Sequence, residues 1–106
     1  MALGQPPIPV IENIHQKVFE AASAPKAINM DDWHTCNTTH CRGGWVVHLA
    51  GEPGYALERF HNTALAAQMI YDASDPTQSF NPSRFFENAE KAMADMRAQA
   101  EAESAR

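Results

Sequence analysis

The chain has 106 residues, of which 44% are hydrophobic and 20% charged, and its net charge is −5. A chain of this length forms one domain and buries roughly 60–70% of the surface that its unfolded form exposes, enough for a core without disulfides or metals. This composition argues against wholesale disorder, and an acidic chain whose eight basic residues form no run argues against a grip on nucleic-acid phosphates.

The N-terminal residues show no targeting or membrane signal. Residues 1–9 carry three prolines and predict an extended lead-in. They contain neither the basic region nor the apolar core of a signal peptide. No stretch of the chain approaches the roughly 20 apolar residues of a membrane span. We therefore expect a cytoplasmic protein with no membrane contact.

An amphipathic helix is predicted over residues 10–22. Its apolar residues recur at helical spacing: Ile11, Ile14, Val18, Phe19 and Ala22. Pro25 ends this helix, and a connector over residues 23–32 leads to Trp33. Long ordered connectors often carry function.

Residues 39–51 predict a helix buried at the centre of the domain. Cys41, Trp45 and His48 fall on one face, and the segment is apolar nearly all round. The start is signalled by three candidate caps, Asn37, Thr38 and Thr39, and the end by Gly51. Glycines at positions 43 and 44 each cost about 1 kcal/mol in a helix. Their presence predicts the close approach of another backbone.

Three further helices are predicted, over residues 53–60, 64–73 and 82–100. The alanines of the second are expected to pack on Gly43 and Gly44. The third is the longest, and its apolar residues have heptad spacing: Phe86, Ala89, Met93, Met96 and Ala100. Residues 101–106 are expected to fray. The fold class is therefore all-α, a compact single domain of four to five helices around residues 39–51.

A cluster of metal-ligating residue types lies at the start of the central helix. His34, Cys36, His40 and Cys41 lie within eight residues, which suggests zinc. The spacing matches none of the usual zinc motifs, and adjacent residues such as His40 and Cys41 point to different sides of a helix. Zinc is therefore an alternative, and we expect no cofactor.

The two cysteines allow two other interpretations. A disulfide between Cys36 and Cys41 would close a very short loop, worth only about 2 kcal/mol, and nothing suggests an oxidising compartment. We expect free thiols. Cys41 in the first turn of a helix would favour a thiolate, so a cysteine nucleophile with a nearby histidine is a third hypothesis. No oxyanion site or third orienting group is recognisable, and we expect no enzymatic activity.

The central stretch resembles a segment of small proteins encoded by phages and prophage-bearing bacteria. In those proteins a Cys-x-Thr-x-x-Cys element runs into a small-Gly-aromatic helix and ends in Leu-Ala-Gly. Here the matching residues are Cys36, Thr38, Cys41, Gly43, Gly44, Trp45, Leu49, Ala50 and Gly51, about a fifth of the chain. Gly43 stands where that pattern has alanine. The resemblance implies a phage or bacterial origin, and because those relatives have no assigned function it implies no activity.

The interpretation that we favour is a small non-catalytic cytoplasmic interaction or accessory protein that binds another protein. Its surface would be the connector over residues 23–36 or the last helix, whose Met-rich stripe could also form a homodimer. The candidate partner-binding residues are Trp33, His34, Arg42, Phe86, Met93 and Met96. The alternatives are a metal- or redox-responsive protein using His34, Cys36, His40 and Cys41, and then a cysteine-nucleophile enzyme.

Overall fold

The computed structural model describes residues 4–106, and the fold class is the one predicted, a predominantly helical single domain. In chain order the elements are α1 (Ile14–Ala22), β1 (His34–Cys36), β2 (Thr39–His40), α2 (Arg42–Leu49), α3 (Gly51–Phe60), α4 (Thr63–Ser74), the short 3₁₀ helix η1 (Pro82–Phe86) and α5 (Ala89–Ser104).

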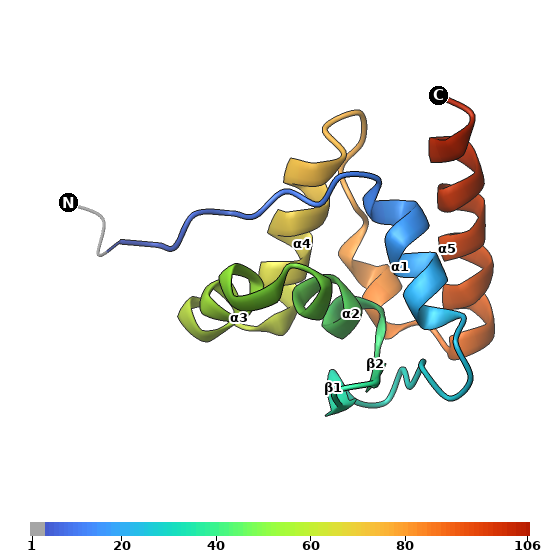
Figure 1. Cartoon of the computed structure of the whole chain (residues 1–106), viewed down its shortest axis with the longest axis horizontal. Coiled ribbons are helices and arrows are strands. Elements are labelled where there is room, and N and C mark those ends of the chain that lie inside the picture. The colour runs from blue at the N-terminus through green and yellow to red at the C-terminus, as the bar shows by residue number, and fades with distance from the viewer. Residues whose placement is uncertain (1–3) are drawn as a thin grey trace.

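The short helix α2 lies at the centre of the molecule. It packs against α1, α3 and α4, while α1 and α5 lie side by side on one flank (Figure 1). Trp45, Val46 and Val47 of α2 are buried in the main core. The prediction of a buried central helix is therefore confirmed, and the hairpin β1–β2 leads directly into it.

The central helix is shorter at its start than predicted. It begins at Arg42, and its N-cap is Cys41, whose Sγ accepts a hydrogen bond from the Gly44 amide at 3.3 Å. The predicted caps at positions 37–39 instead belong to the hairpin, where Thr39 Oγ1 donates to the Lys26 carbonyl. Gly51, with φ of 69°, ends α2 as predicted.

The glycines of α2 do admit another backbone, but it is not that of α4. A Cβ at position 44 would lie 1.8 Å from the Trp33 carbonyl oxygen, and one at position 43 would lie 2.8 Å from Trp33 Cζ3. The expectation that the alanines of α4 fill this surface was wrong. The residue preceding the hairpin fills it, which fixes Trp33 against the start of α2.

The first helix also begins later than predicted, at Ile14 instead of residue 10. Asn13 adopts a left-handed conformation with φ of 55° and supplies no side-chain cap. The N–H groups of His15 and Gln16, which have no acceptor within the helix, donate instead to the carboxylate of Glu103 near the far end of the chain. A distant side chain therefore caps α1.

The last predicted helix is split, and its end is ordered. Residues 82–86 form η1, and α5 begins after Asn88, whose Oδ1 accepts from the Lys91 amide. The fraying expected for residues 101–106 was wrong for most of that segment, because α5 continues to Ser104. Polar contacts stabilise the end of α5. Glu103 accepts a hydrogen bond from the Gln16 amide of α1, and Arg106 forms an ion pair with Asp75.

Candidate functional site

The clearest candidate site is a small hollow beside the start of α2, which we call the aromatic hollow. Trp33 and Phe86 meet edge to face at its mouth, with ring centroids 5.9 Å apart. Phe86 is 73% exposed and Trp33 is partly buried. The volume is about 160 Å³, and the lining residues are Met30, Asp31, Asp32, Trp33, Cys41, Phe85 and Phe86.

Local structure explains why the two rings stand at the surface. The Trp33 carbonyl accepts from the Cys41 amide at 3.3 Å, and its ring packs on Phe85 and Gly43. Phe85 and Phe86 are consecutive in η1, so their side chains point in different directions. Phe85 enters the core and is 2% exposed, which leaves Phe86 outside.

The charged residues that line the aromatic hollow are both acidic. Asp31 and Asp32 line it, and neither carboxylate forms an ion pair with any residue between positions 4 and 106. The remaining lining residues are apolar or, at Cys41, a buried thiol. The hollow thus combines an apolar floor with an acidic edge.

A chain of hydrogen-bonded histidines joins the hairpin to α3. His34 Nε2 is 2.6 Å from Glu58 Oε2, the Nδ1 atoms of His34 and His40 are 2.7 Å apart, and His40 Nε2 is 3.1 Å from the Asn37 carbonyl. Each contact needs one proton, and the Asn37 carbonyl can only accept. His40 Nε2 is therefore the donor to the Asn37 carbonyl, and the contacts join β1 and β2 to Glu58 of α3.

Burial controls the protonation of His40. Its side chain is 1% exposed and stacks on His48 at 4.5 Å. Desolvation lowers its pKa, the neighbouring His48 and His34 lower it further, and the bond to the Asn37 carbonyl opposes this. His40 is therefore the neutral ring of the chain.

The predicted zinc cluster is not assembled. Across residues 4–106, no three or more His, Cys, Asp or Glu side chains converge in a way that could hold a metal ion. His34 and His40 face each other, whereas Cys36 is exposed in β1 and Cys41 is buried at the N-cap of α2.

Both cysteines are free thiols, and the position of Cys41 does not favour a thiolate as the sequence suggested. Burial raises the pKa of Cys41, and this outweighs the lowering effect of the Gly44 and Gly43 amides. Hydrogen bonds from the side chain and backbone of Thr38 lower the pKa of Cys36 to about 7. The thiolate-forming cysteine is Cys36.

The structure separates the six candidate partner-binding residues. Trp33 and Phe86 come together at the aromatic hollow, His34 lies in the histidine chain, and Met93 is partly buried in α5. Arg42 and Met96 have no free surface, with exposures of 0% and 1%, so their assignment to a binding surface was wrong.

Arg42 is an interior residue because α2 turns it toward α4 and α5. Its Nε donates to the Tyr71 hydroxyl at 2.9 Å, its Nη1 pairs with Asp95 at 2.7 Å, and its guanidinium lies 4.7 Å from the centre of the Phe80 ring. Tyr71 and Asp95 lie 29 and 53 residues after Arg42 in the sequence, so these contacts could not be predicted from it.

Some residues of these sites were not identified from the sequence. Asp31 and Asp32 directly precede Trp33, and that acidic pair could have been noticed as a charged neighbour of an aromatic residue. Glu58 and Tyr55 could not, because only the packing of α3 against the hairpin brings them to His34 and His48.

Comparison with protein-family models, curated proteins and solved structures finds no match to this chain. Among the described residues, no helix combines the length and apolar character needed to cross a membrane.

Proposed function

We propose that this protein is a small non-catalytic interaction protein that binds a segment of another protein at the aromatic hollow. The observation that carries the proposal is Phe86, a 73% exposed phenylalanine held against the partly buried Trp33 at the mouth of a hollow. Rigid, partly exposed aromatic rings are the side chains that contribute most to binding energy at protein interfaces.

The dimensions and charge of the hollow define the partner. A volume of about 160 Å³ equals the share of about five liquid water molecules, so the hollow holds one aliphatic side chain. Met30 and Phe85 supply apolar contacts for it, and Asp31 and Asp32 supply negative charge beside it. The partner segment therefore presents a residue such as leucine or methionine flanked by lysine or arginine.

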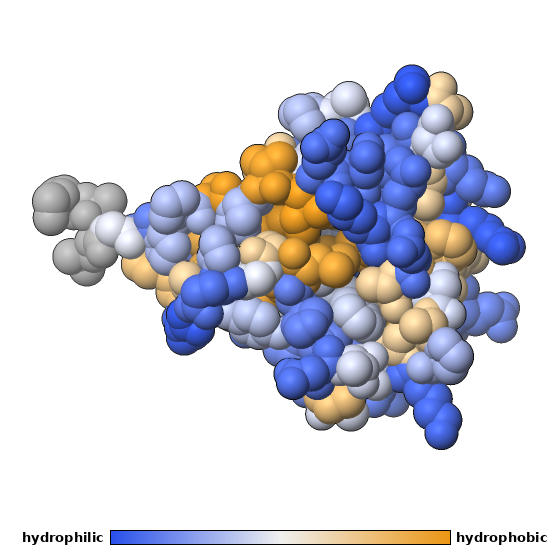
Figure 2. Space-filling view, in the orientation of Figure 1, coloured by the Kyte–Doolittle hydropathy of each residue, from blue (hydrophilic) through white to orange (hydrophobic). Residues whose placement is uncertain are grey.

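Other apolar surfaces fit this role less well. Figure 2 shows hydrophobic residues gathered beside the N-terminal segment. Ile8 and Val10, which belong to that segment, are exposed aliphatic side chains. Neither of these two side chains lines the aromatic hollow. On α5, Met96 and Ala100 of the apolar stripe predicted for a homodimer are buried in the protein's own core, so they are not available to a second copy.

The setting that we propose is the cytoplasm of a bacterium or of a phage-infected cell. The support is the resemblance of residues 36–51 to small phage and prophage proteins.

Redox responsiveness is the second candidate function. The observation that favours it is the exposed thiol of Cys36, whose pKa of about 7 places much of it in the reactive thiolate form near neutral pH. Zinc binding, the other part of this alternative, has less support, because His34 and His40 are hydrogen-bonded to each other.

Selection of binding peptides tests the proposed function. A display library of random peptides is selected on the wild-type protein, and the recovered peptides are measured against Phe86→Ala and against Leu65→Ala, an exposed control on α4. We expect peptides with an aliphatic residue flanked by basic residues, a loss of at least about tenfold in affinity for Phe86→Ala, and no loss for the control. Failure to enrich peptides, or equal binding to both variants, would overturn the proposal.

A further inference from the structure

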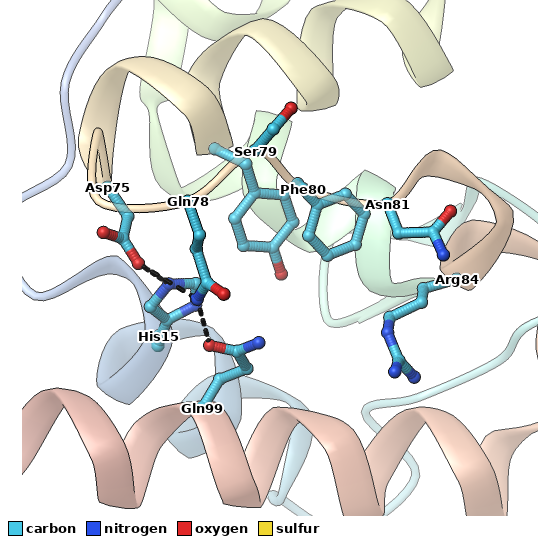
Figure 3. Close-up of a pocket in the computed structure, with 9 residues that line it drawn as sticks. His15, Asp75, Gln78, Ser79, Phe80, Asn81, Arg84 and Gln99 are labelled. Atoms are coloured by element: carbon cyan, nitrogen blue, oxygen red, sulfur yellow. Dashed lines mark hydrogen bonds and ion pairs between the residues drawn. The ribbon is translucent and has the colours of Figure 1, made fainter.

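A second hollow, which we call the polar hollow, lies where the loop after α4 meets α1, η1 and α5 (Figure 3). Its volume is about 230 Å³, the share of about seven or eight liquid water molecules, so the part of a ligand that it encloses is small. The lining residues are His15, Tyr71, Asp75, Gln78, Ser79, Phe80, Asn81, Arg84 and Gln99. None of them belongs to the aromatic hollow.

On one side of the polar hollow the carboxylate of Asp75 is already engaged by donors. Asp75 is 3% exposed and accepts hydrogen bonds from His15 at 2.8 Å and from Arg106 at 3.1 Å. Burial alone would raise the pKa of Asp75, but the bonds from Thr77, His15 and Arg106 outweigh it and hold that pKa well below its usual range. Asp75 is therefore an ionised, fully engaged carboxylate.

The other side carries donors that are partly or fully exposed and have no acceptor within residues 4–106. Arg84 uses only Nη1, for contacts of 3.2–3.4 Å with Glu87 and Asp95. Within residues 4–106 its Nε and Nη2 have no acceptor, nor have the amide nitrogens of Asn81 and Gln99. Figure 3 shows the Gln99 amide nitrogen turned away from Gln78 toward the Arg84 side.

The orientation of both amides follows from their partners. Asn81 Oδ1 accepts from the Ser83 backbone amide, which can only donate. Gln78 Nε2 donates toward Asp75 and also to Gln99 Oε1 at 2.7 Å, so the nitrogen of Gln99 is the free atom. The unpaired groups of this side are thus a guanidinium fork and two amide NH₂ groups.

Donors of this kind complement an oxyanion. Among Asp, Glu, Lys and Arg, the lining residues are Asp75 and Arg84, and Asp75 is paired with Arg106. The carboxylates of Asp72, Glu87 and Asp95 each contact a lining residue from outside the hollow. An arginine fork binds carboxylate and phosphate oxygens in pairs. We propose that the polar hollow binds a small oxyanion, a carboxylate or phosphate of up to about seven non-hydrogen atoms, on Arg84, Asn81 and Gln99.

The site is independent of the proposed partner binding and is tested on the free protein. Amide NMR spectra are recorded during titration with acetate, malonate or inorganic phosphate, at ionic strength held constant with sodium chloride. We expect saturable shifts confined to residues lining the polar hollow. Saturation by the carboxylates, by phosphate or by both supports the site and identifies its ligand.

Arg84→Gln should weaken the binding at least about tenfold, because it removes the charge-assisted hydrogen bonds. Arg59→Gln, which removes one exposed arginine paired with Glu52, is the matched control and should bind as the wild type does. Gln99→Met removes the free amide nitrogen of a half-buried residue of α5, together with the acceptor of the Gln78 bond, and it decides the outcome if Arg84→Gln alters the fold. Shifts that do not saturate, unchanged affinity in Arg84→Gln and Gln99→Met, or an equal loss in Arg59→Gln would overturn the inference.

Discussion

Gly44 determines where Trp33 stands, because the Trp33 carbonyl occupies the space that a side chain at position 44 would need. The obstacle is backbone, which cannot rotate away, and the hydrogen bond from the Cys41 amide to the same carbonyl would also be disturbed. At Gly43 the nearest atom belongs to the Trp33 ring, which has some freedom to shift.

We expect Gly44→Ala to lower the free energy of unfolding by at least about 2 kcal/mol, and Gly43→Ala to lower it less. Urea unfolding followed by circular dichroism measures both variants. Equal stability of the two variants would show that the close approach of Trp33 to α2 is not a constraint.

Cys36 and Cys41 should differ sharply in reactivity. Because the thiolate is the reactive species, the alkylation rate of Cys36 should reach half of its maximum near pH 7, while Cys41 stays protected by burial. Mass spectrometry of peptides after brief iodoacetamide treatment measures each site. Thr38→Val should slow alkylation of Cys36 at pH 7, since the largest lowering of its pKa comes from the Thr38 side chain. Modification of Cys41 at a similar rate would contradict the placement of α2.

At the scale of elements, a buried ion pair joins α2 to α5. Arg42 is fully buried and meets Asp95, whose side chain is 14% exposed. Removal of one partner from such a pair leaves a charge without compensation in the interior.

Asp95→Ala should therefore cost about 3–5 kcal/mol of unfolding free energy. The exposed pair of Glu52 and Arg59 on α3 is the matched comparison, and Glu52→Ala should cost less than about 1 kcal/mol. Chemical denaturation of both variants gives the two values. Similar small losses would mean that α5 does not depend on Arg42.

The helical elements were predictable because each shows apolar residues at helical spacing. Asn62 and Asn81 cap the helices that follow them, with Asn62 Oδ1 accepting from the Leu65 amide and Asn81 Oδ1 from the Ser83 amide. The hairpin was not visible, because two strands of three and two residues are too short for alternation. The ordered end of α5 was missed because polar contacts to α1 and Asp75 hold it.

At the scale of the whole molecule, Asp75 connects distant parts of the chain. It receives contacts from His15 in α1 and from Arg106 at the C-terminus, while Glu103 caps α1. The pKa of Asp75 is lower in the folded protein than in the unfolded chain, so this residue stabilises the fold at pH values above about 4, the ordinary range of aspartate. The contribution falls as the pH drops further, because the unfolded chain then binds the proton first.

Asp75→Asn should accordingly lower the thermal midpoint more at pH 7 than at about pH 3, so that the difference between variant and wild type narrows in acid. Thermal unfolding followed by circular dichroism at both pH values gives this difference. A constant or widening difference would show that ionised Asp75 does not stabilise the fold.

The candidate site was only partly predictable for a related reason. Trp33 was identifiable as an aromatic residue in a connector, and Phe86 as an apolar residue in the last helical segment. Their contact depends on η1 breaking that helix and on Gly43 admitting the Trp33 ring. Arg42 was misassigned because a charged residue near a helix start usually lies at the surface.

The most direct test of the aromatic hollow is the NMR signal of the two tryptophan indole N–H groups during titration with a selected peptide. The Trp45 indole donates to the Ala27 carbonyl at 2.7 Å and is buried, so slow hydrogen exchange identifies its signal. Binding at the hollow should shift the Trp33 signal in a saturable way, leave that of Trp45 nearly unchanged, and require Phe86. A peptide that binds without shifting the Trp33 signal, or that binds Phe86→Ala equally well, would contradict the proposed site.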